Sequence, residues 1–304
     1  MMGVMGNLRD VEAMERRAML ALLLRPNAHW SDVADEVEQR GSALTVLRAP
    51  ALEQGSLFAV KDTVGDELQH ADKLLQEWAS EGMVFRMILD QDYPRQLLTI
   101  RERPPFVTWM GTASDCDASG VAIVGTRKAS DEGTRTAGKL AREFADRGIT
   151  VISGLAAGID TAAHRGALEA GGRTVAVIGT GLRRSYPAQN ESLQREIAAS
   201  GMVLSQFVPD ASPTRFSFPM RNAVMSGLAS ATVVIEADER SGAKMQARLA
   251  LQHGRRVFLM TSLARHEWAQ KLGQRPGARF VSSVDEIVKS LGDLEVGSRE
   301  LVDR

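Results

Sequence analysis

Short apolar runs alternate with longer helix-like segments through the middle of this 304-residue chain. The apolar runs that predict buried strands are Val121–Val124, Thr150–Ile152, Thr174–Ile178, Met202–Ser205, Thr232–Glu236 and Arg256–Leu259. The segments that predict helices are Glu132–Arg147, Ile159–Ala170, Asn190–Ser200, Met220–Ala229 and Ala243–His253. Strands that alternate with helices of this length form right-handed βαβ crossovers, and continuously apolar strands belong to a sheet covered on both faces. We therefore predict an α/β fold with a doubly wound, mainly parallel sheet.

Both ends of the chain differ from this middle. Residues 1–82 predict a small helical domain, with helices over Arg9–Leu24, Asp32–Gly41 (capped by Ser31) and Val64–Glu81. Residues 83–120 contain several prolines, which favour an extended lead-in to the sheet. Residues 121–304 form the sheet domain. In its final part the pattern predicts helices over His266–Leu272 and Val284–Leu291 and a strand over Ala278–Ser282.

Composition excludes several classes of protein. No run of about 18 apolar residues is present, so we expect no membrane span, and the first residues lack the pattern of a signal peptide. Cys116 is the single cysteine, which excludes an internal disulfide and a cysteine-based metal site. These features predict a cytoplasmic protein.

The net charge of −1 conceals an uneven distribution. Residues 1–120 carry 12 Lys and Arg against 19 Asp and Glu, a balance of −7, whereas residues 121–260 carry 18 against 12, a balance of +6. The basic middle favours a polyanionic partner, although a face of solvated arginines would give the same count.

Two loops rich in small residues follow predicted strands of the sheet. One lies within Val151–His164, where Ser153, Gly154 and Gly158 leave little bulk between the backbone and a ligand. Amide groups at the start of the next helix lack internal partners and favour a phosphate. The other loop follows Val121–Val124 and contains Gly125, Thr126, Arg127 and Ser130 at the carboxyl edge, where open α/β sheets bind ligands. Glycine needed for packing and an ordinary surface arginine remain the alternative interpretations.

A third element, Pro213–Asn222, combines Phe216 and Phe218 with two arginines. Aromatic rings next to cations suit single-stranded nucleic acid, because rings stack on bases and cations hold the backbone. Core packing is the alternative for both rings, and we expect one of them in the core.

Catalytic interpretations are weaker. Asp160 and His164 share a helix face, where His164 would act as a base or, more simply, make a packing hydrogen bond. Glu236, Asp238 and Glu239 would hold magnesium or pair with arginines. Neither a G-x-S-x-G elbow nor a Walker loop is present. We predict no catalytic residue, cofactor or metal, and therefore no enzyme.

Taken together, the motifs resemble those of the DNA processing protein A (DprA/Smf) family. The matching runs are D-Y-P, the G-T-R loop, S-G-L-A-x-G-I-D-x-x-A-H, the Y-P after Ser185, F-P-M-R-N, and V-V-I-E-A-D-E-R-S-G-A, in the family order over roughly residues 88–260. The resemblance implies an extended Rossmann-like fold that binds single-stranded DNA, dimerises and helps to load the RecA recombinase during natural transformation. It implies no enzyme of DNA.

The resemblance also implies roles for individual residues. DNA phosphates would contact Gly125, Thr126, Arg127, Ser130 and the amides of Ser153, Gly154, Leu155 and the residues up to Gly158. Arg215 and Arg221 would add charge, Phe218 would stack on a base and Asn222 would hydrogen-bond nearby. Ser241 and Gly242 continue the family pattern, and Lys244 supplies charge from a shifted place.

The chain is a divergent member by this pattern. Ala157 and Ala223 stand where many members carry a basic or large residue. Met260–Gly277 replaces the family segment that contributes to dimerisation and recombinase contact, so a homodimer and RecA as a partner are open questions. A nucleotide-binding sensor or a phosphoribohydrolase-like enzyme is the alternative to single-stranded DNA binding.

Overall fold

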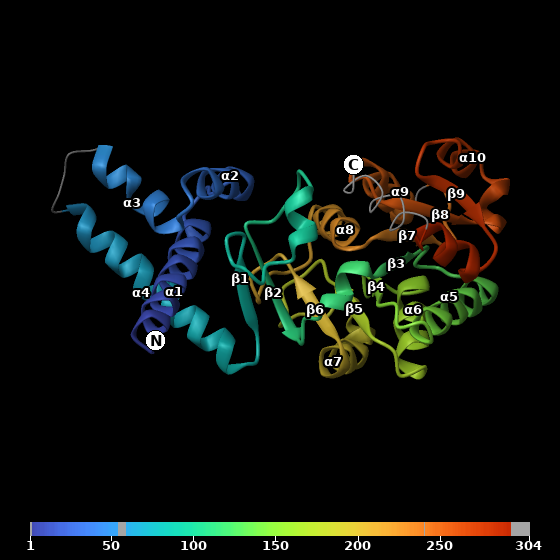
Figure 1. Cartoon of the computed structure of the whole chain (residues 1–304), viewed down its shortest axis with the longest axis horizontal. Coiled ribbons are helices and arrows are strands. Elements are labelled where there is room, and N and C mark those ends of the chain that lie inside the picture. Colours follow the sequence, from blue (N-terminus) through green and yellow to red (C-terminus); the bar gives the residue numbers. More distant parts are fainter. Residues whose placement is uncertain (1, 54–58, 240, 293–304) are drawn as a thin grey trace.

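The computed structural model describes residues 2–53, 59–239 and 241–292 (Figure 1). Within them, nine strands form a single sheet with the order β1-β2-β6-β5-β4-β3-β7-β8-β9. The strands are β1 (Val84–Met87), β2 (Phe106–Gly111), β3 (Val121–Val124), β4 (Val151–Ser153), β5 (Thr174–Val177), β6 (Met202–Ser205), β7 (Ala231–Val234), β8 (Arg256–Met260) and β9 (Ala278–Val281). Neighbours from β6 to β9 pair in parallel, whereas β2 is antiparallel to both β1 and β6. The predicted α/β, mainly parallel sheet is confirmed.

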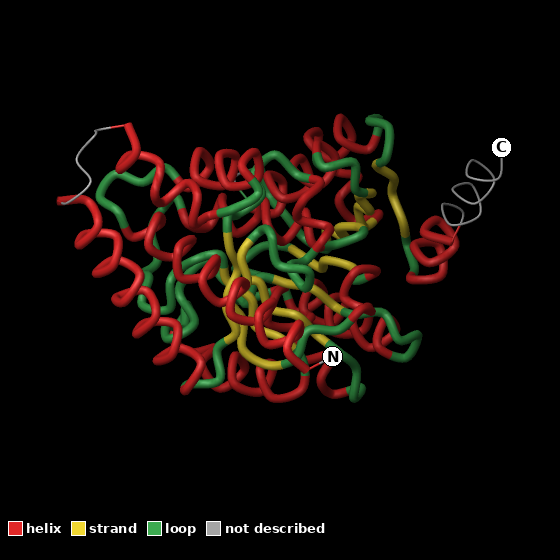
Figure 2. The backbone as a smooth tube through the Cα atoms, turned by 60° about the vertical axis from the view of Figure 1, so that its left-hand side comes forward, coloured by secondary structure: helices red, strands yellow, loops and turns green. Residues whose placement is uncertain are grey.

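Helices cover both faces of this sheet, as Figures 1 and 2 show. One face carries α5 (Asp131–Ala145), α6 (Ile159–Glu169) and α7 (Glu191–Ser200); the other carries α8 (Ser217–Leu228) and α9 (Gly242–Gln252). The short helix α10 (Glu267–Gly273) precedes β9. Strand β3 shows why both faces must be covered, because Val121 and Ile123 belong to one core cluster while Ala122 and Val124 belong to the other.

The N-terminal helices are α1 (Met2–Leu24), α2 (Trp30–Arg40), α3 (Ala43–Glu53) and α4 (Ala59–Ser80). They pack on the β1–β2 end of the sheet, where Trp30 stacks edge-on against Phe106 at 5.4 Å. An ion pair of 2.9 Å between Arg16 and Asp90 adds a second link. Helix α2 begins at Trp30, after His29 rather than at the predicted Ser31 cap, and α3 was not predicted.

The segment 83–120 needs a correction. We predicted a lead-in, but it supplies two strands to the sheet, with Thr108–Gly111 of β2 paired to residues 202–205 of β6. Local sequence gives a weak signal here, because β1 and β2 are short and interrupted by proline-rich turns. Strand β2 pairs with a strand almost a hundred residues away along the chain, and β1 joins the sheet through β2. The side chain of Tyr93 stabilises the intervening loop by donating to the carbonyl of Pro104 at 2.7 Å.

Strand β3 lies at the point where the order of the sheet reverses. From β3 the chain adds β4, β5 and β6 on one side and then returns to place β7 on the other. The carboxyl ends of β3 and β7 therefore border a crevice, which is where open α/β sheets bind ligands. Loops after β3, β4 and β7 all open at this edge.

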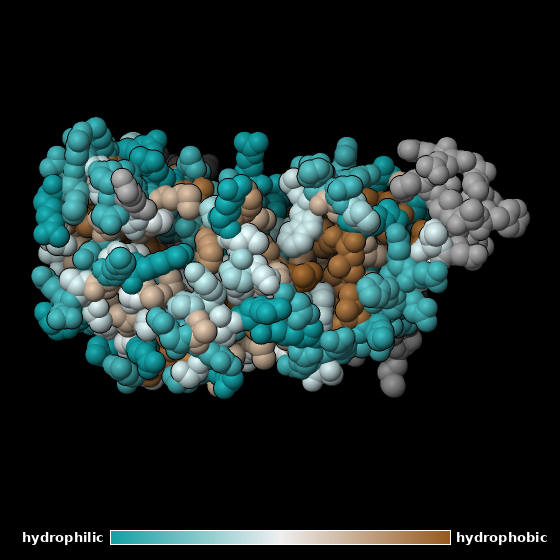
Figure 3. Space-filling view, turned by 180° about the vertical axis from the view of Figure 1, so that it is seen from behind, coloured by the Kyte–Doolittle hydropathy of each residue, from teal (hydrophilic) through white to brown (hydrophobic). Residues whose placement is uncertain are grey.

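The face seen in Figure 3 is largely hydrophilic, with hydrophobic residues gathered in a recess beside the N-terminal helices. Among the described helices, none has the length and apolar character needed to cross a bilayer.

His164 on α6 is completely buried. Its Nδ1 lies 2.7 Å from Thr174 Oγ1, and that hydroxyl in turn donates to the carbonyl of Val151 at 2.8 Å. The hydroxyl proton is thus used, so Nδ1 carries the imidazole proton and donates to Thr174. His164 thus makes a packing hydrogen bond in the core, which was one of the two alternatives for this residue. Burial and then the charge of Arg221 lower the pKa of His164 to about 3.

This buried histidine predicts a loss of stability in mild acid. The unfolded chain binds a proton near the ordinary pKa of 6.5 while the folded chain does not, so the free energy of unfolding should fall by about 1.4 kcal/mol per pH unit below that value from this group. Urea denaturation of the wild type and His164→Leu from pH 7 to pH 5 measures the difference. Equal pH slopes in the two proteins would contradict the assignment.

Candidate nucleic-acid interface

The three predicted loop elements meet in one cleft at the carboxyl edge of β3. This carboxyl-edge cleft has a volume of about 420 Å³. It is lined by Val124, Gly125, Thr126 and Arg127 after β3, Ala156 and Asp160 after β4, Phe218, Arg221, Asn222 and Met225 of α8, and Asp238, Ser241, Gly242, Ala243, Met245 and Gln246 around the start of α9. Segments about a hundred residues apart in sequence thus form a common surface.

An aromatic ring lies beneath a cation at the mouth of this cleft. The guanidinium of Arg127 stands over the ring of Phe218, 5.1 Å from its centroid. Tyr186 also packs on Phe218, with the centroids of the two rings 5.2 Å apart. Arg127 is exposed, Phe218 is partly buried and Tyr186 is 45% exposed. The cluster therefore offers a charged group and two aromatic surfaces to solvent at one place.

The loop after β3 is held by an internal carboxylate. Glu236, just beyond β7, accepts hydrogen bonds of 3.0 Å from both the amide and the hydroxyl of Ser130. Its carbonyl accepts from the amide of Thr126 at 2.7 Å. Ser130 also caps α5 by accepting from the Gly133 amide at 3.0 Å. Ser130, which we predicted to bind phosphate, does not line the cleft, and in this structure its amide and hydroxyl both donate to Glu236.

The loop after β4 is closed in a similar way, against our prediction of open amides. One oxygen of Asp160 accepts from the amides of Gly154 and Ala156 at 3.2 and 3.3 Å. The Ser153 hydroxyl donates to the carbonyl of Ile123, and the carbonyl of Leu155 accepts from Asn190. None of the predicted Ser153, Gly154 and Leu155 lines the cleft, because this loop binds its own carboxylate.

Gly158 is required for a structural reason. Its φ of 81° lies in the left-handed region, and a side chain there would overlap the carbonyl of Thr126. The absence of a Cβ brings the loops after β3 and β4 into contact, which gives Gly158 a structural role besides the phosphate contact that we predicted for it.

Arg221 of α8 is buried, with 5% exposure, although we predicted a DNA-binding charge. Its guanidinium donates to the carbonyls of Gly154 and Val177. Gly154 has no side chain because the guanidinium and the carboxylate of Asp160 occupy that space. Burial lowers the pKa of Arg221 and raises that of Asp160, while the attraction between the two charges opposes both shifts.

The remaining predicted cations lie outside the cleft. Arg215 is exposed and covers the ring of Phe216 at 4.6 Å, and Phe216 is itself 62% exposed. Phe218 is thus more buried than Phe216, and it lines the cleft rather than the main core. Lys244 points to the other side of α9, where it pairs with Glu239 at 2.5 Å. Among the predicted cations within the described residues, Arg127 alone is both exposed and part of the cleft lining.

Ser241 and Gly242 line the cleft where α9 begins, and the Ser241 hydroxyl caps this helix by accepting from the Ala243 amide at 3.2 Å. Glu236 is committed to Ser130, and within the described residues no group of histidines, cysteines and carboxylates has the arrangement of a metal site.

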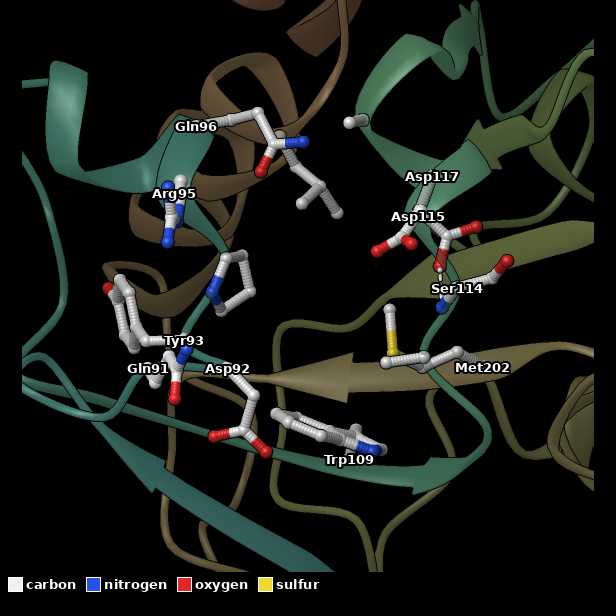
Figure 4. Close-up of a pocket in the computed structure, with 14 residues that line it drawn as sticks. Gln91, Asp92, Tyr93, Arg95, Gln96, Trp109, Ser114, Asp115, Asp117 and Met202 are labelled. Atoms are coloured by element: carbon white, nitrogen blue, oxygen red, sulfur yellow. Dashed lines mark hydrogen bonds between the residues drawn. The ribbon is translucent and has the colours of Figure 1, made fainter.

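A larger cavity, of about 780 Å³, lies at the opposite, amino edge of the sheet (Figure 4). Its walls carry Asp92 on one side and Asp115 and Asp117 on the other, with Trp109 and Met202 between them. Asp117 is paired with Arg173 at 2.6 Å. Carboxylates on both walls disfavour a phosphate backbone, so this cavity is a poorer candidate for a polyanion.

Sequence reasoning missed two contributors to the carboxyl-edge cleft. Tyr186 was quoted as part of a motif without a role, yet an exposed tyrosine after a strand is itself a signal for a surface function. Met245 of α9, 36% exposed, extends the lining toward the N-terminal helices. No local pattern marks it, because its position depends on how α9 packs against α8.

Comparison with known proteins identifies the family. The model of the DNA recombination-mediator protein A family matches residues 84–292. This chain belongs to that family. A curated relative, protein Smf of Synechocystis, is 37% identical over 226 residues, which cover 72% of this chain and 57% of the relative. The chain thus spans little more than half the length of that relative.

Other relatives are matched over more of their length. The DNA processing protein of Bacillus subtilis is 30% identical over 83% of this chain and 86% of its own. The solved structure of DNA processing protein A from Streptococcus pneumoniae superposes with a TM-score of 0.66 at 28% identity, over 91% of this chain and 94% of that one. A structure from Helicobacter pylori, described as showing a single-stranded DNA binding mode, has a TM-score of 0.60 at 26% identity over 69% and 96%.

Because Arg221 is buried, we expect its substitution to change the stability of the fold, independently of any effect on DNA binding. Arg221→Met leaves Asp160 buried without its counter-charge, so the free energy of unfolding should fall by about 3–5 kcal/mol. Urea denaturation measures this loss. The exposed Arg215→Gln serves as the control and should stay within about 0.5 kcal/mol of the wild type. A small effect of Arg221→Met would show that the arginine is dispensable for folding.

Proposed function

We propose that this chain binds single-stranded DNA in the carboxyl-edge cleft, and that it protects the strand and assists loading of the RecA recombinase in DNA uptake or recombination. The observation that carries the proposal is the Arg127–Phe218–Tyr186 cluster at the cleft mouth. Membership of the recombination-mediator family and the described DNA-binding mode of the Helicobacter pylori relative support it.

The contacts of these residues define their parts. Phe218 and Tyr186 provide surfaces on which bases stack, and stacking tolerates any sequence because every base has a flat face. Arg127 holds a phosphate beside the stacked base with its planar guanidinium. Arg215, just outside the cleft, receives the backbone as the strand leaves. Thr126, Asn222 and Ser241 contribute polar groups to the cleft lining.

Side chains, not backbone amides, carry the phosphate contacts in this proposal. Glu236 and Asp160 occupy groups of the two loops that a phosphate would otherwise use. The acidic Asp238 also lines the cleft. Binding therefore depends on few cations and should be modest in strength.

We propose further that the protein acts by binding, without breaking a covalent bond. The candidate base His164 is buried away from the cleft, and Ser241 is used as a helix cap. A homodimer and contact with RecA belong to the same proposal. The segment that would provide them, Met260–Gly277, contains η4 (Thr261–Arg265) and α10 in this structure.

Removal of the Phe218 ring should weaken DNA binding. A stacked base contributes roughly 1–3 kcal/mol, so Phe218→Ala should raise the Kd for labelled oligo-dT by about 5- to 150-fold in a fluorescence-anisotropy titration. Leu98→Ala removes another side chain, 42% exposed, outside the cleft, and should leave the Kd unchanged. An unaltered Kd for a folded Phe218→Ala protein would remove the stacking role.

The salt dependence of binding tests the role of Arg127. Each phosphate contact to a single strand contributes about 0.7 to the slope of log K against log salt concentration. Arg127→Ala should weaken oligo-dT binding and reduce that slope by about 0.7. A wild-type slope near zero would argue against phosphate contacts altogether. If mass spectrometry of the purified protein also found a small phosphorylated ligand, the two results together would favour the alternative of a nucleotide sensor.

A further inference from the structure

A second cleft lies on the other side of α9, outside the surface described above. This α9–α10 cleft has a volume of about 400 Å³ and is lined by Glu239, Lys244, Arg248, Glu267, Trp268, Lys271, Leu272 and Arg275. Lys244 and Arg248 are one turn apart on α9, whereas Lys271 is on α10 and Arg275 lies two residues beyond the end of that helix. Like charges at this spacing on a helix repel each other.

The charges of this cleft are only partly balanced. Lys244 pairs with Glu239, and Lys271 pairs with Glu267. Lys271 and also Lys244 lower the pKa of Glu267, which shows that the two ion pairs influence each other. Arg248 and Arg275 are exposed and have no ion pair among the described residues. Four cations against two carboxylates leave a surplus of two positive charges.

Trp268 provides an independent sign of an absent partner. The side chain is 5% exposed, and within the described structure its Nε1 has no hydrogen-bond acceptor. Its ring lies 5.8 Å from the ammonium group of Lys244. Buried indole N–H groups usually have an acceptor. A ligand with anionic oxygens would pair with the two arginines, and a turn of the Trp268 ring toward the cleft would let the buried N–H donate to it as well.

We propose that the α9–α10 cleft binds a phosphate group, and that this phosphate belongs to the same DNA strand after it leaves the carboxyl-edge cleft. The first turn of α9 separates the two clefts, because Ala243 and Met245 line one while Lys244 lines the other. A strand that crosses this turn passes from the aromatic cluster to Arg248 and Arg275. This inference rests on the proposed DNA binding and lengthens its binding path.

The residues of this site also explain the shifted position of Lys244. Trp268, Lys271 and Arg275 all lie in Met260–Gly277, the segment that departs from the family pattern. Lys244 faces this segment and not the carboxyl-edge cleft. The displaced lysine and the divergent segment therefore form one site.

Oligonucleotide length tests the proposal. A strand of about 6 nucleotides fills the carboxyl-edge cleft, whereas one of about 20 nucleotides also reaches the second cleft. Arg248→Gln combined with Arg275→Gln should leave the Kd of the short strand unchanged, weaken the long strand about five- to tenfold, and reduce its salt slope by about 1.4. Trp268→Phe, which removes only the indole N–H, should weaken the long strand by a few fold with no change in slope.

Controls separate this inference from the proposed function. Arg165→Gln combined with Arg195→Gln removes the same charge from α6 and α7 and should leave both strands unaffected. Failure of the wild type to bind the short strand would contradict the proposed function itself. If the wild type binds the short strand normally, and the wild type and the double variant bind the long strand with equal Kd, only the longer binding path is overturned. Pyrophosphate binding can be measured by calorimetry in both proteins. If the double variant loses pyrophosphate binding while its Kd for the long strand stays unchanged, the cleft binds a small phosphorylated ligand instead, and the strand path is overturned.

Discussion

The buried contact between Arg221 and the loop after β4 organises the whole carboxyl edge. Its guanidinium donates to the carbonyls of Gly154 and Val177, at the ends of two neighbouring strands, and lies near the carboxylate of Asp160. Each charge would be costly to bury alone, so each requires the other. Phe218 lies three residues before Arg221 on α8 and therefore on the same side of the helix. Because Arg221 is fixed in the protein interior, Phe218 is held at the cleft mouth.

Internal carboxylates make this edge different from an open phosphate-binding loop. Asp160 accepts hydrogen bonds from two amides after β4, and Glu236 accepts hydrogen bonds from the amide and the hydroxyl of Ser130. These bonds hold the loops in one conformation before any ligand arrives. In the proposed binding mode, exposed side chains therefore recognise the phosphates, and one of them, Arg127, is held over an aromatic ring. A rigid cleft with few charges suits the proposed binding of a DNA strand through several weak contacts along its length.

Positive charge is correspondingly spread along a path. Arg127 lies at the cleft, Arg215 at its edge, and Arg248 and Arg275 beyond the first turn of α9. The cavity at the amino edge carries carboxylates instead. An excess of carboxylates at the amino edge and exposed arginines near the ends of β3 and β7 agree with the proposal that a polyanion binds at the carboxyl edge.

The alternation of apolar runs and helices was sufficient to predict the parallel sheet, and small residues after β3 and β4 marked the edge that forms the cleft. These features are local, because a buried strand must be apolar and a loop in close contact must lack bulk. The sequence could not show that Glu236 and Asp160 occupy the loops, that Arg221 is buried, or that Tyr186 joins Phe218. Nor could it show that β1 and β2 complete the sheet. Each depends on residues brought together from distant segments, and only the tertiary packing decides which partner satisfies a given charge or amide.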